Sequence, residues 1–172
     1  MLELNVRSKR AAIYEIEAWL KEQGFGVTLT DYRRPWGAFW YIDTQETPRF
    51  LKTFFEDVEL RQESMQPKIL LVAPELRLSW QYHLRRSEIW NVVHGPVGVM
   101  LSRSDKETKV KEYQDGGQVE IPVERRHRLI GVGEWGVVAE VWVHTDADNP
   151  SDEDDIVRIS DDFGRALQNK EA

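Results

Sequence analysis

The chain of 172 residues contains no cysteine. Disulfide bonds and thiolate metal sites are therefore excluded, and any metal ligands must be nitrogen or oxygen atoms. The sequence also lacks a run approaching the ~18 apolar residues of a transmembrane helix, and its first residues lack the apolar segment of a secretory signal. We therefore expect a cytoplasmic protein with no membrane partner.

Positive charge is scarce as well, because 23 Lys and Arg residues stand against 30 Asp and Glu, a formal net charge of −7. This balance argues against general nucleic-acid binding. An anionic small molecule would need cationic side chains gathered at its own site. Aromatic residues are plentiful, with seven Trp, and indicate a globular fold with aromatic-rich cores or interfaces.

Residues 8–23 carry apolar side chains at helical spacing, with Ser8 placed to cap the helix and Gly24 to end it. We expect residues 1–30 to form an N-terminal helical extension that packs on the main domain or on a dimer partner. Residues 31–172 are expected to form that domain. A homodimer would also cover the large apolar face predicted around Trp80 and Tyr82.

From residue 68 onwards, short segments rich in Val, Ile, Leu and Trp alternate with turn signals such as Gly95-Pro96 and Gly116-Gly117. This spacing predicts an all-β sandwich or barrel, not an α/β fold. Short helices are expected near residues 49–56 and within 156–168. Strands are expected at residues 38–43, 69–73, 76–83, 88–94, 97–101, 109–113, 118–121, 128–132 and 137–143.

Gln81, His83, Glu88 and His127 form the main candidate site. Residues two apart in a strand point the same way, so Gln81 and His83 share a face. Glu88 can return on the next strand and His127 on a third. We expect these four side chains to bind one divalent cation, of which Zn²⁺ fits and Mn, Fe, Co or Ni are also compatible. The alternative is a hydrogen-bonded core network.

The segment from Leu78 to Gly95, with Q-x-H-x-x-x-x-E inside it, resembles the first cupin motif, and Gly116-x5-Pro122 followed by His127 resembles the second. More narrowly, the chain resembles type II phosphomannose isomerases, the cupin class often fused behind a mannose-1-phosphate guanylyltransferase. Further matching segments are Arg34-Pro-Trp-Gly and Glu153-Asp-Asp-Ile-Val-Arg, and the match spans residues 34–165. The resemblance implies a cupin double-stranded β-helix, or jelly-roll barrel, with an N-terminal amphipathic helix and a short C-terminal helical segment.

The resemblance also implies a function: a metal-dependent isomerase that interconverts an aldose and a ketose phosphate, of the mannose-6-phosphate/fructose-6-phosphate type, through an enediolate. A bound divalent metal suits that intermediate. Two alternatives remain open. One is a non-catalytic cupin that binds a sugar or sugar phosphate, and the other is an oxygen-using cupin with Fe.

Within the isomerase hypothesis, Lys68, Glu140 and Arg86 are the candidate catalytic residues. Lys68 and Glu140 are candidates for the general base, although Lys68 could equally bind phosphate and Glu140, in an apolar run, could be structural. Candidate substrate-binding residues are Arg77, Arg86, Arg158 and Arg165, since arginine suits phosphate. Arg86, Arg158 and Arg165 match family positions, and Arg77 lies on the predicted ligand face. For Arg158 the alternative is an ion pair with a neighbouring Asp, and Arg34 is expected to form a structural corner.

Overall fold

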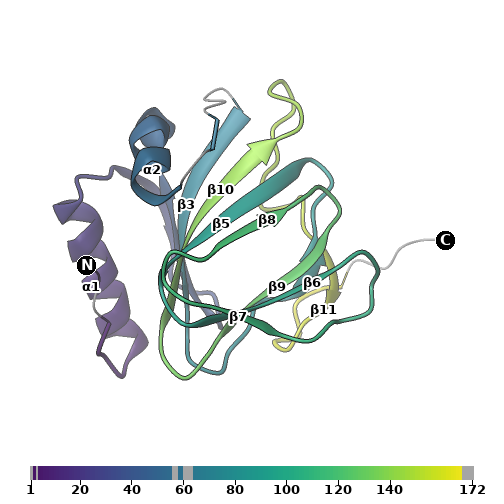
Figure 1. Ribbon diagram of the computed structural model, residues 1–172, viewed down its shortest axis with the longest axis horizontal. Coiled ribbons are helices and arrows are strands. Elements are labelled where there is room, and N and C mark those ends of the chain that lie inside the picture. Colours follow the sequence, from purple (N-terminus) through teal and green to yellow (C-terminus); the bar gives the residue numbers. More distant parts are fainter. Residues whose placement is uncertain (1, 3, 56–57, 60–63, 168–172) are drawn as a thin grey trace.

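The computed structural model describes residues 2, 4–55, 58–59 and 64–167. Within these residues two antiparallel sheets face each other, and the helices lie against the outer face of one of them (Figure 1). The expected all-β class with an N-terminal helix is confirmed. None of the described helices is long and apolar enough to cross a membrane.

The helices of the described chain are α1 (Lys9–Glu22), the 3-10 helix η1 (Thr44–Glu46) and α2 (Thr47–Phe54). The first sheet contains, in spatial order, β1 (Val27–Asp31), β2 (Gly37–Ile42), β3 (Met65–Val72), β10 (Gly136–His144), β5 (Arg86–His94) and β8 (Gln118–Ile121). The second contains β11 (Val157–Ser160), β4 (Trp80–Tyr82), β9 (Arg126–Gly131), β6 (Val97–Ser102) and β7 (Lys111–Tyr113).

The first sheet separates two apolar cores, because its side chains alternate between the two faces. In β2, Trp40 and Ile42 belong to the core that α1 completes with Ile16 and Leu20. Phe39, the residue before Trp40, belongs to the core between the sheets. A sheet covered on both faces explains why β2, β3 and β10 are nearly continuous apolar runs.

The face between the sheets changes from apolar to charged along β3 and β10. Leu70 and Val138 lie in the apolar core. Two residues away on the same face, Lys68 and Glu140 are also buried, and they are paired in register across the two strands. Because buried charges need partners or a ligand, this charged end is where a functional site is expected.

The N-terminal helix begins after Ser8, whose Oγ accepts a hydrogen bond from the backbone N–H of Ala11 at 3.2 Å. Its buried face, which includes Ala12, packs on the first sheet of the same chain. The expected boundary between residues 30 and 31 falls inside β1, which pairs with β2. The segment before residue 31 is thus joined to the main sheet by strand pairing as well as by side-chain packing.

Some expected elements differ in the structure. The helical segment expected within residues 156–168 is instead the strand β11 followed by turns, and residue 168 lies outside the described residues. Pairing of Arg158 with Gln81 of β4 gives this backbone hydrogen-bond partners that an isolated short helix would lack. The strand expected at residues 76–83 is confined to β4, with Arg77 in an isolated bridge to Ile130. The expected helix at 49–56 is α2; residue 56 is not described.

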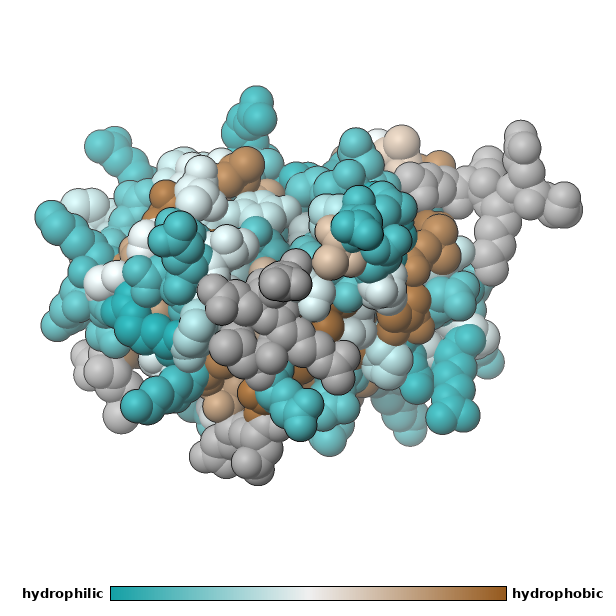
Figure 2. All heavy atoms as spheres, turned by 90° about the horizontal axis from the view of Figure 1, so that it is seen from above, coloured by the Kyte–Doolittle hydropathy of each residue, from teal (hydrophilic) through white to brown (hydrophobic). Residues whose placement is uncertain are grey.

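Trp80 and Tyr82, expected to offer an exposed apolar face, are buried within the chain. The Trp80 Nε1–H donates to the backbone oxygen of Asp105 at 2.8 Å, and the Arg126 guanidinium lies 4.1 Å from the Tyr82 ring centroid. From above, hydrophilic residues cover most of the visible surface, with smaller hydrophobic areas between them (Figure 2). A homodimer therefore stays a prediction, without the surface first expected to form it.

Candidate functional site

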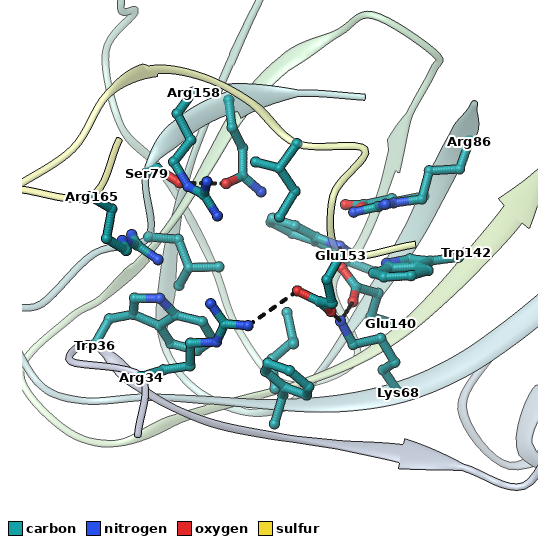
Figure 3. A pocket seen from close by; sticks show the side chains of 17 residues that line it. Arg34, Trp36, Lys68, Ser79, Arg86, Glu140, Trp142, Glu153, Arg158 and Arg165 are labelled. Atoms are coloured by element: carbon teal, nitrogen blue, oxygen red, sulfur yellow. Dashed lines mark hydrogen bonds and ion pairs between the residues drawn. The ribbon is translucent and has the colours of Figure 1, made fainter. Parts of the chain in front are cut away.

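A cavity lies at the charged end of the space between the sheets (Figure 3). Residues of β3, β5 and β10 line one side of it, and β4 with the C-terminal segment lines the other. Its charged lining consists of five cations, Arg34, Lys68, Arg86, Arg158 and Arg165, and three carboxylates, Glu88, Glu140 and Glu153. The cavity therefore carries an excess of positive charge in a chain of net charge −7, which favours an anionic ligand.

His83, Glu88 and His127 meet at the inner end of this region. Their potential ligand atoms all lie within 4.8 Å of one another, and all three side chains are buried. The Nε2 atom of His83 is 3.1 Å from Glu88 Oε1, and that of His127 is 3.4 Å from Glu88 Oε2. The residues come from the end of β4, from β5 and from β9, so strand pairing fixes their relative positions.

Backbone carbonyls orient both imidazole rings. The Nδ1 of His83 is 2.6 Å from the backbone oxygen of Asp155, and the Nδ1 of His127 is 2.8 Å from that of Arg125. A carbonyl only accepts, so each Nδ1 must carry the proton and donate it. Each Nε2 then presents a lone pair towards Glu88, which is the usual arrangement of metal-binding histidines.

The donor set fits a divalent cation. His127 Nε2 and Glu88 Oε2 are both buried and lack a hydrogen-bond partner among the described residues. Burial lowers the pKa of His127 to about 4, so its ring is neutral near pH 7. Burial alone would raise the pKa of Glu88, but neighbouring positive charge, including the Arg86 guanidinium that donates to Oε1, holds it well below its usual range. A lone pair therefore faces a carboxylate, and a cation would satisfy both.

Gln81 lies beside this cluster. It is paired in register with His127 across β4 and β9 and lines the cavity. Its Oε1 accepts a hydrogen bond from Ser79 Oγ at 2.5 Å. The structure therefore places the expected amide ligand next to the other three, with its carbonyl oxygen held by Ser79.

Arg86 provides the cation nearest to the candidate ligands. Its Nε donates to Glu88 Oε1 at 2.8 Å, and its Nη2 donates to His83 Nε2 at 3.1 Å. The guanidinium stacks on Trp142, 3.5 Å from the ring centroid, and Nη1 donates to Ser151 Oγ at 2.7 Å. The hydrogen bond from Arg86 uses the lone pair of His83 Nε2. A metal ion bound to His83 would replace this hydrogen bond.

Lys68 and Glu140 form a buried pair, with Lys68 Nζ 3.5 Å from Glu140 Oε2. Trp90 Nε1 donates to the other oxygen of Glu140 at 2.9 Å. Burial, together with the nearby charge of Glu88, raises the pKa of Glu140 to about 7 despite Lys68. The Nζ atom of Lys68 also lies 4.1 Å from the Trp142 ring centroid, within the range of a cation–π contact.

Among the cations that line the cavity, Arg158 is the one that has no partner in the described residues. Its guanidinium makes no hydrogen bond or ion pair with the residues that the structure describes, and its Nε is buried. Of the three aspartates expected as its partners, Asp161 binds Arg165 and Asp162 binds Arg77, and Asp154 makes no ion pair with it. Burial and neighbouring arginines lower the pKa of Arg158, as expected where like charges converge. In Figure 3, Arg158, Arg165 and Arg34 point towards the same open space.

The structure does not bring every expected residue into the site. Arg77 lies outside the cavity, with its Nε 2.5 Å from Asp162 Oδ2, and its side chain is partly exposed. Alternation placed it on the ligand face, but the backbone between Arg77 and β4 is not a regular strand, so the alternation does not extend to it.

Arg34 and Glu153 also line the cavity, although they are absent from the site expected from the sequence. Arg34 was expected to form a structural corner, but it lines the cavity and its Nη2 lies 3.4 Å from Glu153 Oε2. Both belong to segments already noted for their resemblance to the cupin family. That resemblance was the available signal, since no local pattern connects residues 119 positions apart.

The sandwich is shared with known cupins. Vicilin from hazelnut (Corylus avellana) matches 73% of this chain and 33% of its own with a TM-score of 0.52 and 15% identity. An oxalate decarboxylase structure matches 66% of this chain and 27% of its own with a TM-score of 0.50 and 16% identity. Structural similarity at such low sequence identity shows the fold alone. Together with the two antiparallel sheets, it defines the fold as a cupin jelly roll.

Residues 25–161 match the sequence profile of the family described as "Mannose-6-phosphate isomerase C-terminal". The chain belongs to this family.

Curated relatives include the Xanthan biosynthesis protein XanB of Xanthomonas campestris pv. campestris (strain B100), 33% identical over 77% of this chain and 23% of the relative. The mannose-1-phosphate guanylyltransferase of Salmonella montevideo is 29% identical over 81% of this chain and 24% of the relative. The alginate biosynthesis protein AlgA of Pseudomonas aeruginosa is 31% identical over 78% and 23%. The chain spans about a quarter of the length of these relatives.

These relatives correct the expected function. They are named for guanylyl transfer and for polysaccharide biosynthesis, not for isomerisation, and the family description places the shared domain at a C-terminus. The prediction of a sugar-phosphate isomerase is therefore wrong. The alternative, a non-catalytic cupin that binds a sugar or sugar phosphate, agrees better with the comparisons.

Proposed function

We propose that this cupin domain binds a sugar phosphate without converting it. The observation that carries the proposal is the unpaired guanidinium of Arg158 in a cavity with an excess of positive charge. The Arg158 side chain is only partly exposed, and an anionic ligand would give it the partner that it lacks. Arginine suits phosphate because its planar fork can donate two parallel hydrogen bonds.

The sugar part of the ligand would occupy the region between Arg158 and the inner cluster, which consists of His83, Glu88 and His127. Trp36, Trp90 and Trp142 line the cavity together with polar groups such as Gln81. Aromatic walls with a few polar groups are typical of sugar and small-molecule sites. The mannose in the names of the family and of one relative makes mannose 6-phosphate the first ligand to test.

We further propose that His83, Glu88 and His127, with Gln81 beside them, hold one divalent cation, Zn²⁺ or another metal that accepts nitrogen and oxygen ligands. The bound metal would act as a Lewis acid towards an oxygen atom of the sugar. The orientation of the two imidazoles by backbone carbonyls supports this assignment.

Binding without turnover agrees with the placement of the candidate proton-transfer groups. Lys68 Nζ is paired with two carboxylates, 3.5 Å from Glu140 Oε2 and 3.0 Å from Glu153 Oε1. In the proposal these groups shape the electrostatics of the cavity.

The test is isothermal titration calorimetry with mannose 6-phosphate and with mannose, on metal-stripped and metal-restored protein, combined with a coupled assay for fructose 6-phosphate. We expect binding that requires the phosphate group, and no product. Equal affinity for mannose and its phosphate would contradict the anion site. Turnover that depends on His127 would contradict the non-catalytic role.

A further inference from the structure

The carboxylate of Glu153 already sits among the cations of the cavity (Figure 3). Its Oε1 accepts hydrogen bonds from Tyr41 Oη at 2.8 Å and from Lys68 Nζ at 3.0 Å, and its Oε2 lies 3.4 Å from Arg34 Nη2. The two carboxylate oxygens thus face three converging donors. A phosphate group at the same place could accept hydrogen bonds from the same three donors.

The loop that carries Glu153 is held in place by other residues. The carboxylate of Asp155 accepts hydrogen bonds from the backbone N–H groups of Leu84 at 3.1 Å and Arg85 at 2.9 Å. It also accepts one from Ser151 Oγ at 2.6 Å. Because these bonds fix the loop independently, the Glu153 side chain can change its rotamer without rearranging the backbone around it.

The displaced carboxylate can turn towards solvent, because the Glu153 side chain is 32% exposed. Lys68 and Glu140, by contrast, have side chains that are about 5% exposed or less. Among the acidic side chains that line the cavity, Glu153 is therefore the one that can reach solvent without separation of the two sheets.

The small volume of the cavity supports such a movement of the Glu153 side chain. Its volume is about 40 Å³, while one water molecule needs roughly 10 to 15 Å³ on the same measure and sites for small molecules usually measure hundreds of cubic ångströms. With Glu153 in place there is room for a few waters, and a sugar phosphate needs more.

We propose that Glu153 is an intramolecular competitor, whose carboxylate occupies the anion position and must be displaced when a phosphate group binds. This inference rests on the proposed binding function and adds the residue that sets its affinity. The free energy of ligand binding is then the difference between two sets of contacts. One is the set that the ligand makes with Arg34, Lys68 and Tyr41, and the other is the set that Glu153 loses.

The test compares Glu153→Gln with Asp154→Asn, an exposed position in the same loop that loses the same charge. Inorganic phosphate and mannose 6-phosphate are titrated into each protein by calorimetry, with thermal unfolding as the check on folding. We expect Glu153→Gln to bind inorganic phosphate about tenfold more tightly or better, since one competing charge-assisted contact is removed. Asp154→Asn should change it by less than about twofold because water and salt screen an exposed charge.

The outcomes separate the two proposals. If the unmodified protein binds phosphate and Glu153→Gln binds it no more tightly, or only as much as Asp154→Asn does, the competitor role is overturned and the binding function stands. If neither the unmodified protein nor Glu153→Gln binds any of the phosphates, both proposals fall. Should Glu153→Gln not fold, Glu153→Asp keeps the charge but shortens the reach to Lys68, and an unchanged phosphate affinity there would overturn the competitor role.

Discussion

The backbone oxygen of Asp155 accepts a hydrogen bond from His83 Nδ1 at 2.6 Å. This contact joins the loop that carries Glu153 to one of the candidate metal ligands. The same loop holds Arg86, whose Nη1 donates to Ser151 Oγ and to the backbone oxygen of Asp152. The inner cluster and the outer anion position therefore share one structural support, although they lie at different depths in the sandwich.

Replacing His127 by Ala is expected to weaken the binding of Zn²⁺ by more than about 100-fold, since loss even of groups that only orient a ligand costs 10- to 100-fold. Metal content after dialysis and titration of apo-protein measure the effect. His94→Ala is the matched control, because His94 lies outside the ligand cluster. Retention of metal by a folded His127→Ala protein would show that the ligand set is wrong.

Replacing Arg158 by Gln is expected to weaken mannose 6-phosphate binding about tenfold or more, the value of one charge-assisted hydrogen bond. Arg103→Gln, at an exposed position away from the cavity, removes the same charge and should have little effect. Calorimetry compares the two variants. A similar loss in both would mean that only the overall charge of the protein matters.

The Glu140→Gln variant is expected to remove part of the pH dependence of stability in metal-free protein. Burial raises the pKa of Glu140 to about 7 from an ordinary 4.5, so the folded state holds its proton to higher pH than the unfolded state does. Native stability from this group is therefore present below pH 4.5 and is lost as the pH rises towards 7, by up to about 3 kcal/mol.

Urea unfolding at pH 5 and pH 8 measures that difference. The free energy of unfolding of the unmodified protein should fall relative to Glu140→Gln between these values, because groups common to both proteins cancel. A difference that stays constant from pH 5 to pH 8 would contradict the raised pKa of Glu140.

Gly131, in the strand that carries His127, is expected to tolerate no side chain. A Cβ atom there would lie 2.0 Å from the backbone oxygen of Ala73, whereas a Cβ atom at Gly26 would lie 3.5 Å from the Cβ of Asp43. Gly131→Ala should therefore destabilise the protein by about 3 kcal/mol, and Gly26→Ala by much less. Thermal and urea unfolding of both variants check this, and equal stabilities would show that β9 can move away from Ala73.

Much of the fold follows from local patterns. The alternation of apolar residues predicted most of the strands, including residues 118–121, which form β8 with the same bounds. The edge strand β1 was not predicted, because its residues are largely exposed and lack a clear alternation. The C-terminal strand was predicted as a helix, because its pairing with β4 involves residues about 80 positions earlier in the sequence.

The sequence by itself determined the jelly-roll class and the types of side chain in the inner cluster. His83, Glu88 and His127 could be selected because strand periodicity and the cupin-like spacing act over short distances. Only the tertiary structure decided which charges meet at the cavity. Arg77 is bound by Asp162 outside it, while Arg34 meets Glu153 from 119 residues away. Such pairings depend on the register of strands and the packing of two sheets, which no local sequence pattern specifies.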